Sequence, residues 1–355
     1  MEQNLSDNLV ISIDAMGGDN SPRIVIEGLN IAAKKNADLR FLLFGDEEQI
    51  NPLLRQYPKV EKVSKVIHTA ERVKNEDKPS QVIRNRNTSM YMAIDAVRSG
   101  RAQAIVSAGN TGALMAISKM VLKTIHGIHR PAICTIMPHS DGRYVMLDLG
   151  ANTECDAVNL SEFAIMGNIF AKHALDIESP KVALLNIGAE EMKGKEEIRQ
   201  ALKILKNPQL DINFTGYVEP HEICNGAADV IVADGFTGNV ALKTIEGTAR
   251  FVVKMIKRAV KRSILAKIGL PFMLGVVGKI KKSMDPRAYN GAMLIGLNGL
   301  SVKSHGGTDG FGYAVAVLNA AKLVRQNFVS TIREEIEKVD LEELNQESIY
   351  EGYYL

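Results

Sequence analysis

Six short turns hold most of the residues in this chain that could do chemistry. Each follows an apolar, β-branched run and combines glycine with polar side chains. They are DAMGGD (14–19), SAGNTGAL (107–114), DLGAN (148–152), NIGAEEMKG (186–194), ADGFTGNVALKT (233–244) and KSHGGTDG (303–310). Glycine lets the backbone approach a ligand closely, and the amides that start a following helix favour an anion such as phosphate. One such turn is weak support for an anion site, but six are much stronger.

These turns supply anion-binding groups and no recognisable covalent nucleophile. None matches the phosphate loop or the full dinucleotide-binding glycine pattern, and no G-x-S-x-G segment presents a serine. Cys155 follows one turn, but we expect it to be a buried spectator. The anion-binding candidates are Asn110, Thr111, Asn152, Lys193, Thr237, Asn239, Lys243 and His305. This set is compatible with a transfer in which a bound phosphate-like anion itself attacks.

Such an attack requires donors fixed in advance for the negative charge that develops on the group under attack. We expect Lys193, Asn110 and Asn239 to supply them, together with backbone amides of the SAGNTG and DGFTGN turns. Four aspartates at strand ends would repel phosphate if they faced it, so we expect them to orient cations or amides: Asp14, Asp19, Asp148 and Asp234.

Each of these residues also has a plain structural interpretation. The aspartates and asparagines can be helix caps or turn braces, and Lys193 can be a solvated charge. His305 can be a hydrogen-bonded turn residue or can transfer a proton. The remaining candidates for substrate or phosphate binding are Gly17, Gly18, Gly112, Asn186, Gly188, Gly235 and Gly238.

The elements that must position these turns alternate along the chain. The pattern predicts strands at Leu9–Ile13, Leu39–Phe44, Val63–Ile67, Ala104–Ser107, Ile133–Met137, Tyr144–Leu149, Val182–Asn186, Ile212–Thr215, Val230–Ala233 and Leu300–Lys303. It predicts helices at Pro22–Ala37, Ser89–Arg98, Ala113–Leu122, Val158–His173, Lys195–Lys206 and Gly310–Lys338. Such alternation predicts an α/β fold with a mostly parallel sheet covered on both faces. Ligands bind outside the carboxyl ends of such strands, so we expect the six turns on one rim. We expect one α/β/α catalytic domain over residues 1–340 and an acidic tail over 341–355.

A basic segment interrupts this pattern at about 248–285. Ten of the 43 basic side chains lie between Gly247 and Met284 with no acidic one, so the remainder carries 33 basic against 41 acidic side chains, about −8. The basic face of the expected helix Thr248–Leu265 carries Arg250, Lys254, Lys257, Arg258 and Lys261. An apolar tip, Ile268–Val277, follows and includes Phe272, Met273 and Leu274. Ten residues are too few to span a bilayer, which takes about twenty. The segment favours an anionic membrane surface or an acidic protein partner, and the alternative is a solvated helix packed on its own core.

Composition limits the other classes of function. The chain is 46% hydrophobic and long enough to bury a full-sized core. Its three cysteines are widely spaced, no H-x-x-x-H pair is present, and the first eight residues do not predict a secretory signal. We therefore expect a cytoplasmic protein with no metal and no cofactor. With no Trp and few aromatics among its basic residues, we expect no nucleic-acid binding.

The turns, with the RPA segment at 130–132 and in this order, resemble those of the bacterial phosphate acyltransferases of the PlsX family over roughly Val10 to Ala321. The resemblance implies transfer of a fatty acyl chain from acyl-acyl carrier protein to inorganic phosphate, giving acyl phosphate for phospholipid synthesis. It also implies a three-layer Rossmann-like fold similar to phosphate acetyltransferases and the isocitrate/isopropylmalate dehydrogenases. A homodimer attached peripherally to the membrane is implied too, with a membrane glycerol-3-phosphate acyltransferase as a further candidate partner.

Two alternatives stay open at the sequence level. A coenzyme A-dependent phosphate acetyltransferase-like enzyme could use the same turns. Its acetyl donor is soluble, however, so it would not need the basic helix and the apolar tip to bind a membrane. A non-catalytic module that docks on membranes or carrier proteins would leave the six glycine-bearing turns unexplained.

Overall fold

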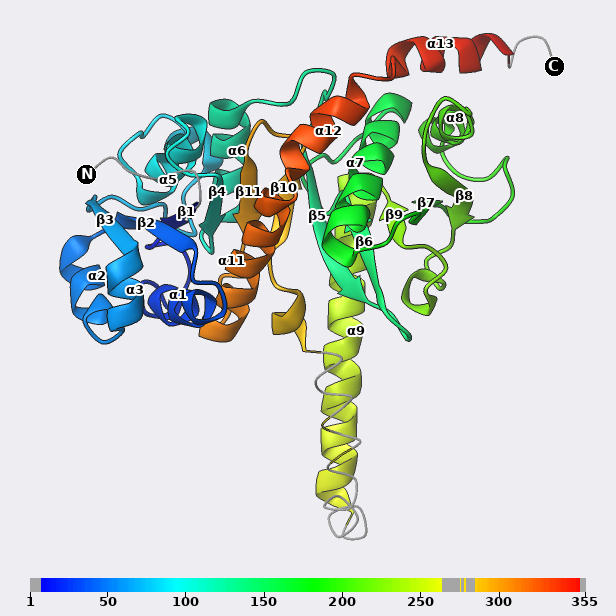
Figure 1. Cartoon of the computed structure of the whole chain (residues 1–355). Coiled ribbons are helices and arrows are strands. Elements are labelled where there is room, and N and C mark those ends of the chain that lie inside the picture. Colours follow the sequence, from blue (N-terminus) through cyan, green and yellow to red (C-terminus); the bar gives the residue numbers. More distant parts are fainter. Residues whose placement is uncertain (1–7, 264–274, 276–277, 279–284, 352–355) are drawn as a thin grey trace.

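The computed structural model describes residues 8–263, 275, 278 and 285–351. Within this part of the chain, eleven strands form one sheet in the order β3-β2-β1-β4-β11-β10-β5-β6-β9-β7-β8 (Figure 1). The strands are β1 (Leu9–Asp14), β2 (Leu39–Gly45), β3 (Ser64–His68), β4 (Ala104–Ser107), β5 (Ala132–Pro138), β6 (Arg143–Leu147), β7 (Lys181–Leu185), β8 (Asn213–Val218), β9 (Val230–Val232), β10 (Ala292–Ile295) and β11 (Leu300–Lys303). The expected α/β fold with a mostly parallel sheet is confirmed.

The helices that follow the strands at their glycine-bearing turns carry the site. The described α-helices are α1 (Arg23–Lys35), α2 (Glu47–Leu54), α3 (Pro58–Val63), α4 (Pro79–Val82), α5 (Ser89–Arg98), α6 (Thr111–Leu122), α7 (Ala157–Leu175), α8 (Glu196–Leu205), α9 (Gly235–Arg262), α11 (Gly310–Arg325), α12 (Phe328–Ile336) and α13 (Leu341–Glu351). Two 3-10 turns, η1 (Ile223–Asn225) and η2 (Pro286–Tyr289), complete the set.

The expectation that all six turns share one rim is wrong, because the sheet reverses direction in its middle. Strands β3, β2, β1, β4 and β11 run parallel to one another, as do β6, β9, β7 and β8. Between these two sets, β10 runs antiparallel to both β11 and β5, and β5 pairs antiparallel with β6. The carboxyl ends of the two sets therefore point in opposite directions along the sheet. Three glycine-bearing turns follow strands of one set and three follow strands of the other.

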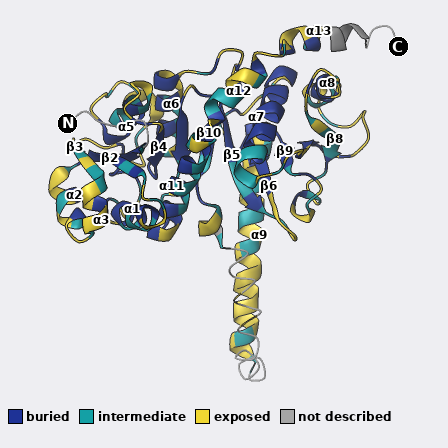
Figure 2. Ribbon diagram, viewed as in Figure 1, coloured by how far each residue is buried: buried dark blue, intermediate teal, exposed yellow. Residues whose placement is uncertain are grey.

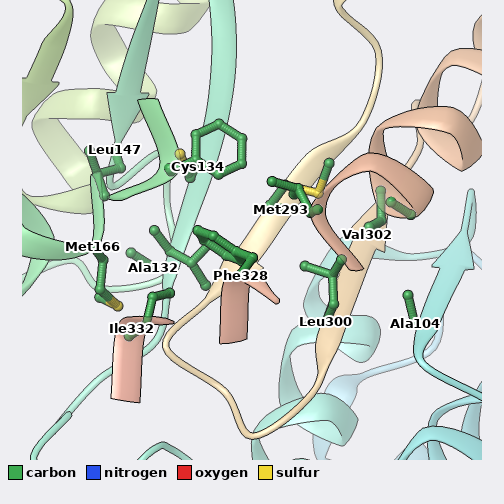
Figure 3. Packing of buried hydrophobic residues seen from close by; sticks show 14 of the residues in the cluster. Ala104, Ala132, Cys134, Leu147, Met166, Met293, Leu300, Val302, Phe328 and Ile332 are labelled. Carbon is green, nitrogen blue, oxygen red and sulfur yellow. The ribbon is translucent and has the colours of Figure 1, made fainter. Parts of the chain in front are cut away.

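Buried side chains alternate between the two faces of the sheet, as they must when both faces are covered. On one face, residues such as Ile11, Val106 and Met293 pack against α1, α7, α8, α11 and α12. Figure 3 shows this packing near the sheet centre, where Met166 of α7 and Phe328 of α12 approach the strands. On the other face, α5 and α6 cover the half that contains β1 and β4. The first turns of α9 cover the half that contains β6, β7 and β9.

Helix α9 is docked on the sheet only at its start. Ala241, Leu242 and Ile245 pack on the core, whereas Phe251 and Ile256 are 61% and 58% exposed. Its 28 residues extend about 42 Å, and Figures 1 and 2 show it leaving the body of the protein with mostly exposed residues. The sequence analysis placed the start of this helix at Thr248, 13 residues late. The alternative of a helix packed along its length on its own core is wrong for this chain.

One further expectation needs correction. The helix expected over Gly310–Lys338 is broken, because Asn327 adopts a left-handed conformation (φ +53°) between α11 and α12. The acidic tail begins with a helix, α13, whose Leu341 and Leu344 are buried. All of the apolar tip except Gly275 lies outside the described residues, including Phe272, Met273 and Leu274.

Candidate active site

The glycine-bearing turns form two hydrogen-bonded groups. We call the turns after β1, β4 and β11 (residues 14–19, 107–114 and 303–310) the β1 cluster. We call the turns after β6, β7 and β9 (residues 148–152, 186–194 and 233–244) the β9 cluster. The reversal of the sheet separates the two, so each is described by itself.

Asp14 is the centre of the β1 cluster and is almost completely buried. Its two carboxylate oxygens each accept a hydrogen bond of 2.6 Å, one from the hydroxyl of Ser89 and one from that of Ser107. Burial raises the pKa of Asp14, and the two hydroxyls and the charge of Lys303 act against that rise. The carboxylate therefore braces the turn from inside, and Ser89, at the start of α5, was not predicted from the sequence.

Lys303 ends β11 and was also missed. Its ammonium group donates to the backbone carbonyls of Ala108 and Ser304. Burial lowers the pKa of Lys303 to about 8, although Asp14 and Asp19 favour its charged form. The next loop residue, His305, is exposed and accepts a hydrogen bond at Nδ1 from the amide of Gly307, 3.1 Å away. This contact supports a turn-bracing role for His305.

Asn110 is engaged on both sides of its amide. Its oxygen caps α6 by accepting from the amide of Ala113 at 3.0 Å, and its nitrogen donates to the carbonyl of Asn75 at 2.9 Å. Thr111, directly after it, is exposed at the first position of the helix. In the first turn, Asp19 is exposed and accepts from Asn75, while Gly18 has φ +106°, where a side chain would be strained.

Asp148 is the counterpart of Asp14 in the β9 cluster. Its oxygens accept from the amides of Ile133 (2.9 Å), Ala151 (3.1 Å) and Asn152 (2.7 Å), and from the Asn152 side chain (3.0 Å). Burial raises the pKa of Asp148, and these donors oppose the rise. The side-chain nitrogen of Asn152 also donates to the carbonyl of Pro131. These contacts brace the turn, and the anion-binding role expected for Asn152 from the sequence stays a prediction.

Glycine is required where α9 starts against this turn. A Cβ on Gly238 would lie 1.9 Å from the carbonyl oxygen of Asp148, and one on Gly235 would lie 2.5 Å from that of Asn152. Both distances are far below any real contact. The helix can therefore begin this close to the β6 turn only because both positions lack a side chain.

Asp234 caps α9 and connects it to the β7 turn. Its carboxylate accepts from the amide and the hydroxyl of Thr237, both at 2.8 Å. Its second oxygen lies 3.5 Å from the ammonium group of Lys195, whose side chain is 66% exposed. Lys195 was not singled out from the sequence, although it follows the turn by one residue.

Lys193 and Asn239 face solvent. Lys193 is exposed and its amide donates to the carbonyl of Glu190, which folds the turn back on itself. Asn186, buried beneath, donates to the carbonyl of Lys193 at 3.1 Å. Asn239 is exposed on the second turn of α9, beside Gly150. Further along α9, exposed Lys243 lies 3.8 Å from Glu246.

Large apolar side chains are exposed in the same two segments, the β7 turn and the start of α9. Ile187 is 75% and Met192 is 81% exposed in the β7 turn, and Phe236 is 64% and Val240 is 51% exposed at the start of α9. Exposed apolar groups that gather in this way indicate a binding surface for apolar matter. The sequence carried this signal, since Ile187 and Met192 are apolar residues inside an otherwise polar turn.

Cys155, three residues after the β6 turn, is partly buried. Burial and the charge of Asp148 raise the pKa of Cys155 to about 12, so its thiolate form is disfavoured. Within the described residues, no three His, Cys, Asp or Glu side chains are arranged to hold a metal ion. Nor does any helix there have the length and hydropathy to cross a membrane.

Known proteins similar to this chain agree with one another. A family model described as "Fatty acid synthesis protein" matches residues 9–331. A phosphate acyltransferase of Paramagnetospirillum magneticum is 47% identical over 349 residues, covering 98% of this chain and 99% of that protein. A phosphate acyltransferase of Rhodospirillum centenum is 50% identical over 336 residues, covering 94% of this chain and 95% of that protein.

Solved structures share the fold at low sequence identity. A phosphotransacetylase from Streptococcus pyogenes superposes with a TM-score of 0.60 at 18% identity, covering 91% of this chain and 95% of that one. A branched-chain phosphotransacylase from Enterococcus faecalis gives a TM-score of 0.54 at 16% identity, covering 89% and 99%.

Proposed function

The chain belongs to the fatty acid synthesis protein family, and we propose that it is a phosphate acyltransferase with its reaction centre at the β9 cluster. It transfers a fatty acyl group from acyl-acyl carrier protein to inorganic phosphate and so forms acyl phosphate for phospholipid synthesis. The resemblance noted from the sequence supports the same family.

One observation supports this placement most directly. The β9 cluster combines two exposed lysines, Lys193 and Lys195, with the exposed apolar side chains of Ile187, Met192 and Phe236. A fatty acyl thioester and phosphate together present an apolar chain and negative charge. Burying a large apolar side chain contributes about 1.5–3 kcal/mol, so these residues can hold an acyl chain that short-chain enzymes do not need to bind.

The reaction is an acyl transfer without an acyl-enzyme. A phosphate oxygen attacks the thioester carbonyl, a carbon–oxygen bond forms, and the carbonyl oxygen becomes negative. Lys193 and the side chain of Asn239 stabilise that charge. The carbon–sulfur bond then breaks, the carrier leaves as a thiolate, and it takes a proton from water. Asp148 and Asp234 hold the two turns in place through the hydrogen bonds described above.

The test is product formation with donors of different chain length. The protein should convert long-chain acyl-acyl carrier protein and phosphate to acyl phosphate, trapped as its hydroxamate. Replacing Ile187 and Met192 by Ser should lower kcat/KM at least tenfold for a long-chain donor and change a two-carbon donor less than twofold. Val329→Ser, at a partly buried position on α12, controls for the loss of an apolar side chain away from the β7 turn. An equal loss of kcat/KM for both donors would show that the β7 turn does not bind the acyl chain.

We also propose that α9 and the apolar tip attach the protein peripherally to anionic membranes. The exposed cations Lys254, Lys257 and Lys261 support this, since each near an anionic surface contributes about 1 kcal/mol. Replacing them by Glu should release the protein from phosphatidylglycerol vesicles. Replacing Phe272, Met273 and Leu274 by Ser should do the same without loss of turnover on a carrier-bound donor. Binding unchanged at low salt would contradict the proposal.

The homodimer belongs to the same proposal. Apolar side chains such as Val252 and Ile256 are exposed along α9 and offer a surface for a second copy. Ile256→Glu should shift the mass measured by light scattering from dimer to monomer. A dimer that persists in this variant would place the dimer contact elsewhere.

A further inference from the structure

A hollow of about 590 Å³ lies between α5, the residues just before it and the end of α6. Four cationic side chains line it, Arg86, Arg98, Arg101 and Lys123, against one carboxylate, Asp95. We call it the basic groove. The groove has an excess of three positive charges, although the chain outside residues 247–284 carries 33 basic against 41 acidic side chains.

The charges of the groove are only partly neutralised. Asp95 lies 2.7 Å from Arg98 and 3.7 Å from Arg101, so it offsets part of that pair. Arg86, before α5, and Lys123, after α6, make no ion pair within the described part of the chain. Lys123 is also held at φ +57°, a region that favours glycine, so a lysine stands there at a cost in backbone strain.

The lining between these cations is apolar and adaptable. It consists of Tyr91, Met92, Met120 and Val121, and Met120 is 41% exposed. Methionine side chains adjust their shape to a partner at little cost and are common on protein-binding surfaces. A lining that combines apolar side chains with cations fits an acidic helix that presents a few apolar side chains.

The groove adjoins the β1 cluster through α5. Ser89, three residues after Arg86, donates to Asp14 in the β1 cluster. Met115, in the middle of α6, packs against the buried residues of both halves of the sheet face that α9 also covers. The groove therefore lies on the same side of the sheet as the start of α9.

We propose that the basic groove is the docking surface for the acidic carrier protein that brings the acyl group, an inference that rests on the proposed function. The basic face of α9 then serves the membrane, and the two anionic partners bind at different places. A bilayer is a poorer match for the groove, because a flat surface does not enter a concave site. Single-stranded nucleic acid would require exposed aromatic rings, and Tyr91 is half-buried.

The first measurement is binding of holo-acyl carrier protein without an acyl chain, followed by fluorescence anisotropy, since it does not depend on turnover. The double variant Arg86→Glu/Lys123→Glu should raise Kd about tenfold or more and flatten its salt dependence. The matched control Lys59→Glu/Lys62→Glu changes the net charge equally on α3 and should stay within twofold. Melting temperatures confirm that both variants are folded.

Three results would overturn the proposal. The first is equal weakening by the groove and control variants. The second is weakening only in Lys254→Glu/Lys257→Glu, which would make α9 the docking surface. The third is a groove variant that no longer binds phosphatidylglycerol vesicles but still binds the carrier protein. Turnover with a small acyl thioester that lacks the carrier separates this idea from the proposed function. Suppose that the parent protein forms no acyl phosphate from any donor, while the groove variant loses carrier binding. The docking proposal would then stand, and the proposed reaction would be refuted.

Discussion

Asp14 is the last residue of β1 and Asp148 directly follows β6, so the two look equivalent in sequence, but their neighbours in the structure differ. Asp14 is held by two serine hydroxyls and lies close enough to Lys303 for the two charges to interact. Asp148 is held by backbone amides of its own turn and of β5. The β1 cluster thus pairs Asp14 with Lys303. In the β9 cluster Asp148 is held mainly by backbone amides, Asp234 contacts Thr237 and Lys195, and Lys193 stays exposed.

The difference teaches how to weigh a glycine-bearing turn. Both clusters have the glycines and the helix starts that an anion site needs. The β9 cluster adds exposed cations beside several large exposed apolar side chains, such as Met192 and Phe236. The β1 cluster is followed by Phe311, which is 40% exposed and lies under Arg287. An amphiphilic substrate is therefore recognised by the exposed cations and exposed apolar side chains of a turn, and not by the glycine motif alone.

The largest effect expected is on folding, at Gly238. Its Cβ in Gly238→Ala would lie 1.9 Å from a backbone oxygen, so the variant should lose at least about 3 kcal/mol of unfolding free energy. In the β1 cluster, Gly109→Ala meets first the flexible end of Met90 at 2.8 Å and should lose about 1–2 kcal/mol. Gly247→Ala, with open space around it on α9, should gain about 0.5–1 kcal/mol. Urea unfolding orders the three, and equal losses at Gly238 and Gly109 would erase this contrast between the clusters.

Next in size is the loss of turnover at Lys193. Lys193→Ala should lower kcat/KM for acyl phosphate formation about 1000-fold, or about 4 kcal/mol, with an unchanged melting temperature. His305→Ala in the β1 cluster should lose less than tenfold, because its ring braces a turn. Lys203→Ala, an exposed lysine on α8, controls for the loss of charge. If His305 proves the more sensitive position, the reaction centre belongs to the β1 cluster.

The two asparagines, grouped together as oxyanion donors from the sequence, should now separate. Asn239→Ala should reduce kcat by about 2–3 kcal/mol in transition-state stabilisation and leave stability unchanged. Asn110→Ala removes a helix cap and should cost about 1 kcal/mol of stability, with kcat lowered only a few-fold. Kinetics and thermal unfolding of both variants decide this. A catalytic loss at Asn110 as large as at Asn239 would restore the original grouping.

The fold class and most strands could be predicted from the sequence because buried parallel strands are short apolar runs separated by helices. The reversal of the sheet was missed with β10, a four-residue strand beyond the basic segment. The hairpin of β5 and β6 left a usable signal, since Asp141-Gly142 separates two apolar runs. That signal would have placed the turns on opposed sets of strands.

The sequence shows the turn motifs of the candidate site, but not which distant residues contact them. Lys195 and Asp234 are 39 positions apart, and Ser89 lies 75 positions from Asp14, so no local pattern joins them. Only the pairing of strands brings such groups together. The start of α9 was missed because its first turns, GFTGN, contain two glycines that ordinarily disfavour a helix. Packing of Gly235 and Gly238 against the β6 turn overrides that preference.

The smallest effect expected concerns the internal charge of the β1 cluster. The pKa of Lys303 is lowered from 10.5 to about 8 by burial. Below pH 8 the lysine is protonated in the folded and the unfolded chain. Between about pH 8 and 10.5 the unfolded chain binds more protons, so this residue should make stability rise with pH there. Because the side chain is only partly buried, we expect a gain of about 1 kcal/mol, which Lys303→Met should lack.

The measurement is urea unfolding of parent and variant at pH 7.5, 9 and 10.5, since the difference between them isolates Lys303 from other titrating groups. Parallel pH profiles for the two proteins would mean that Lys303 is solvated as freely as Lys193, and the contrast between an internally paired and an open cluster would lose its electrostatic basis.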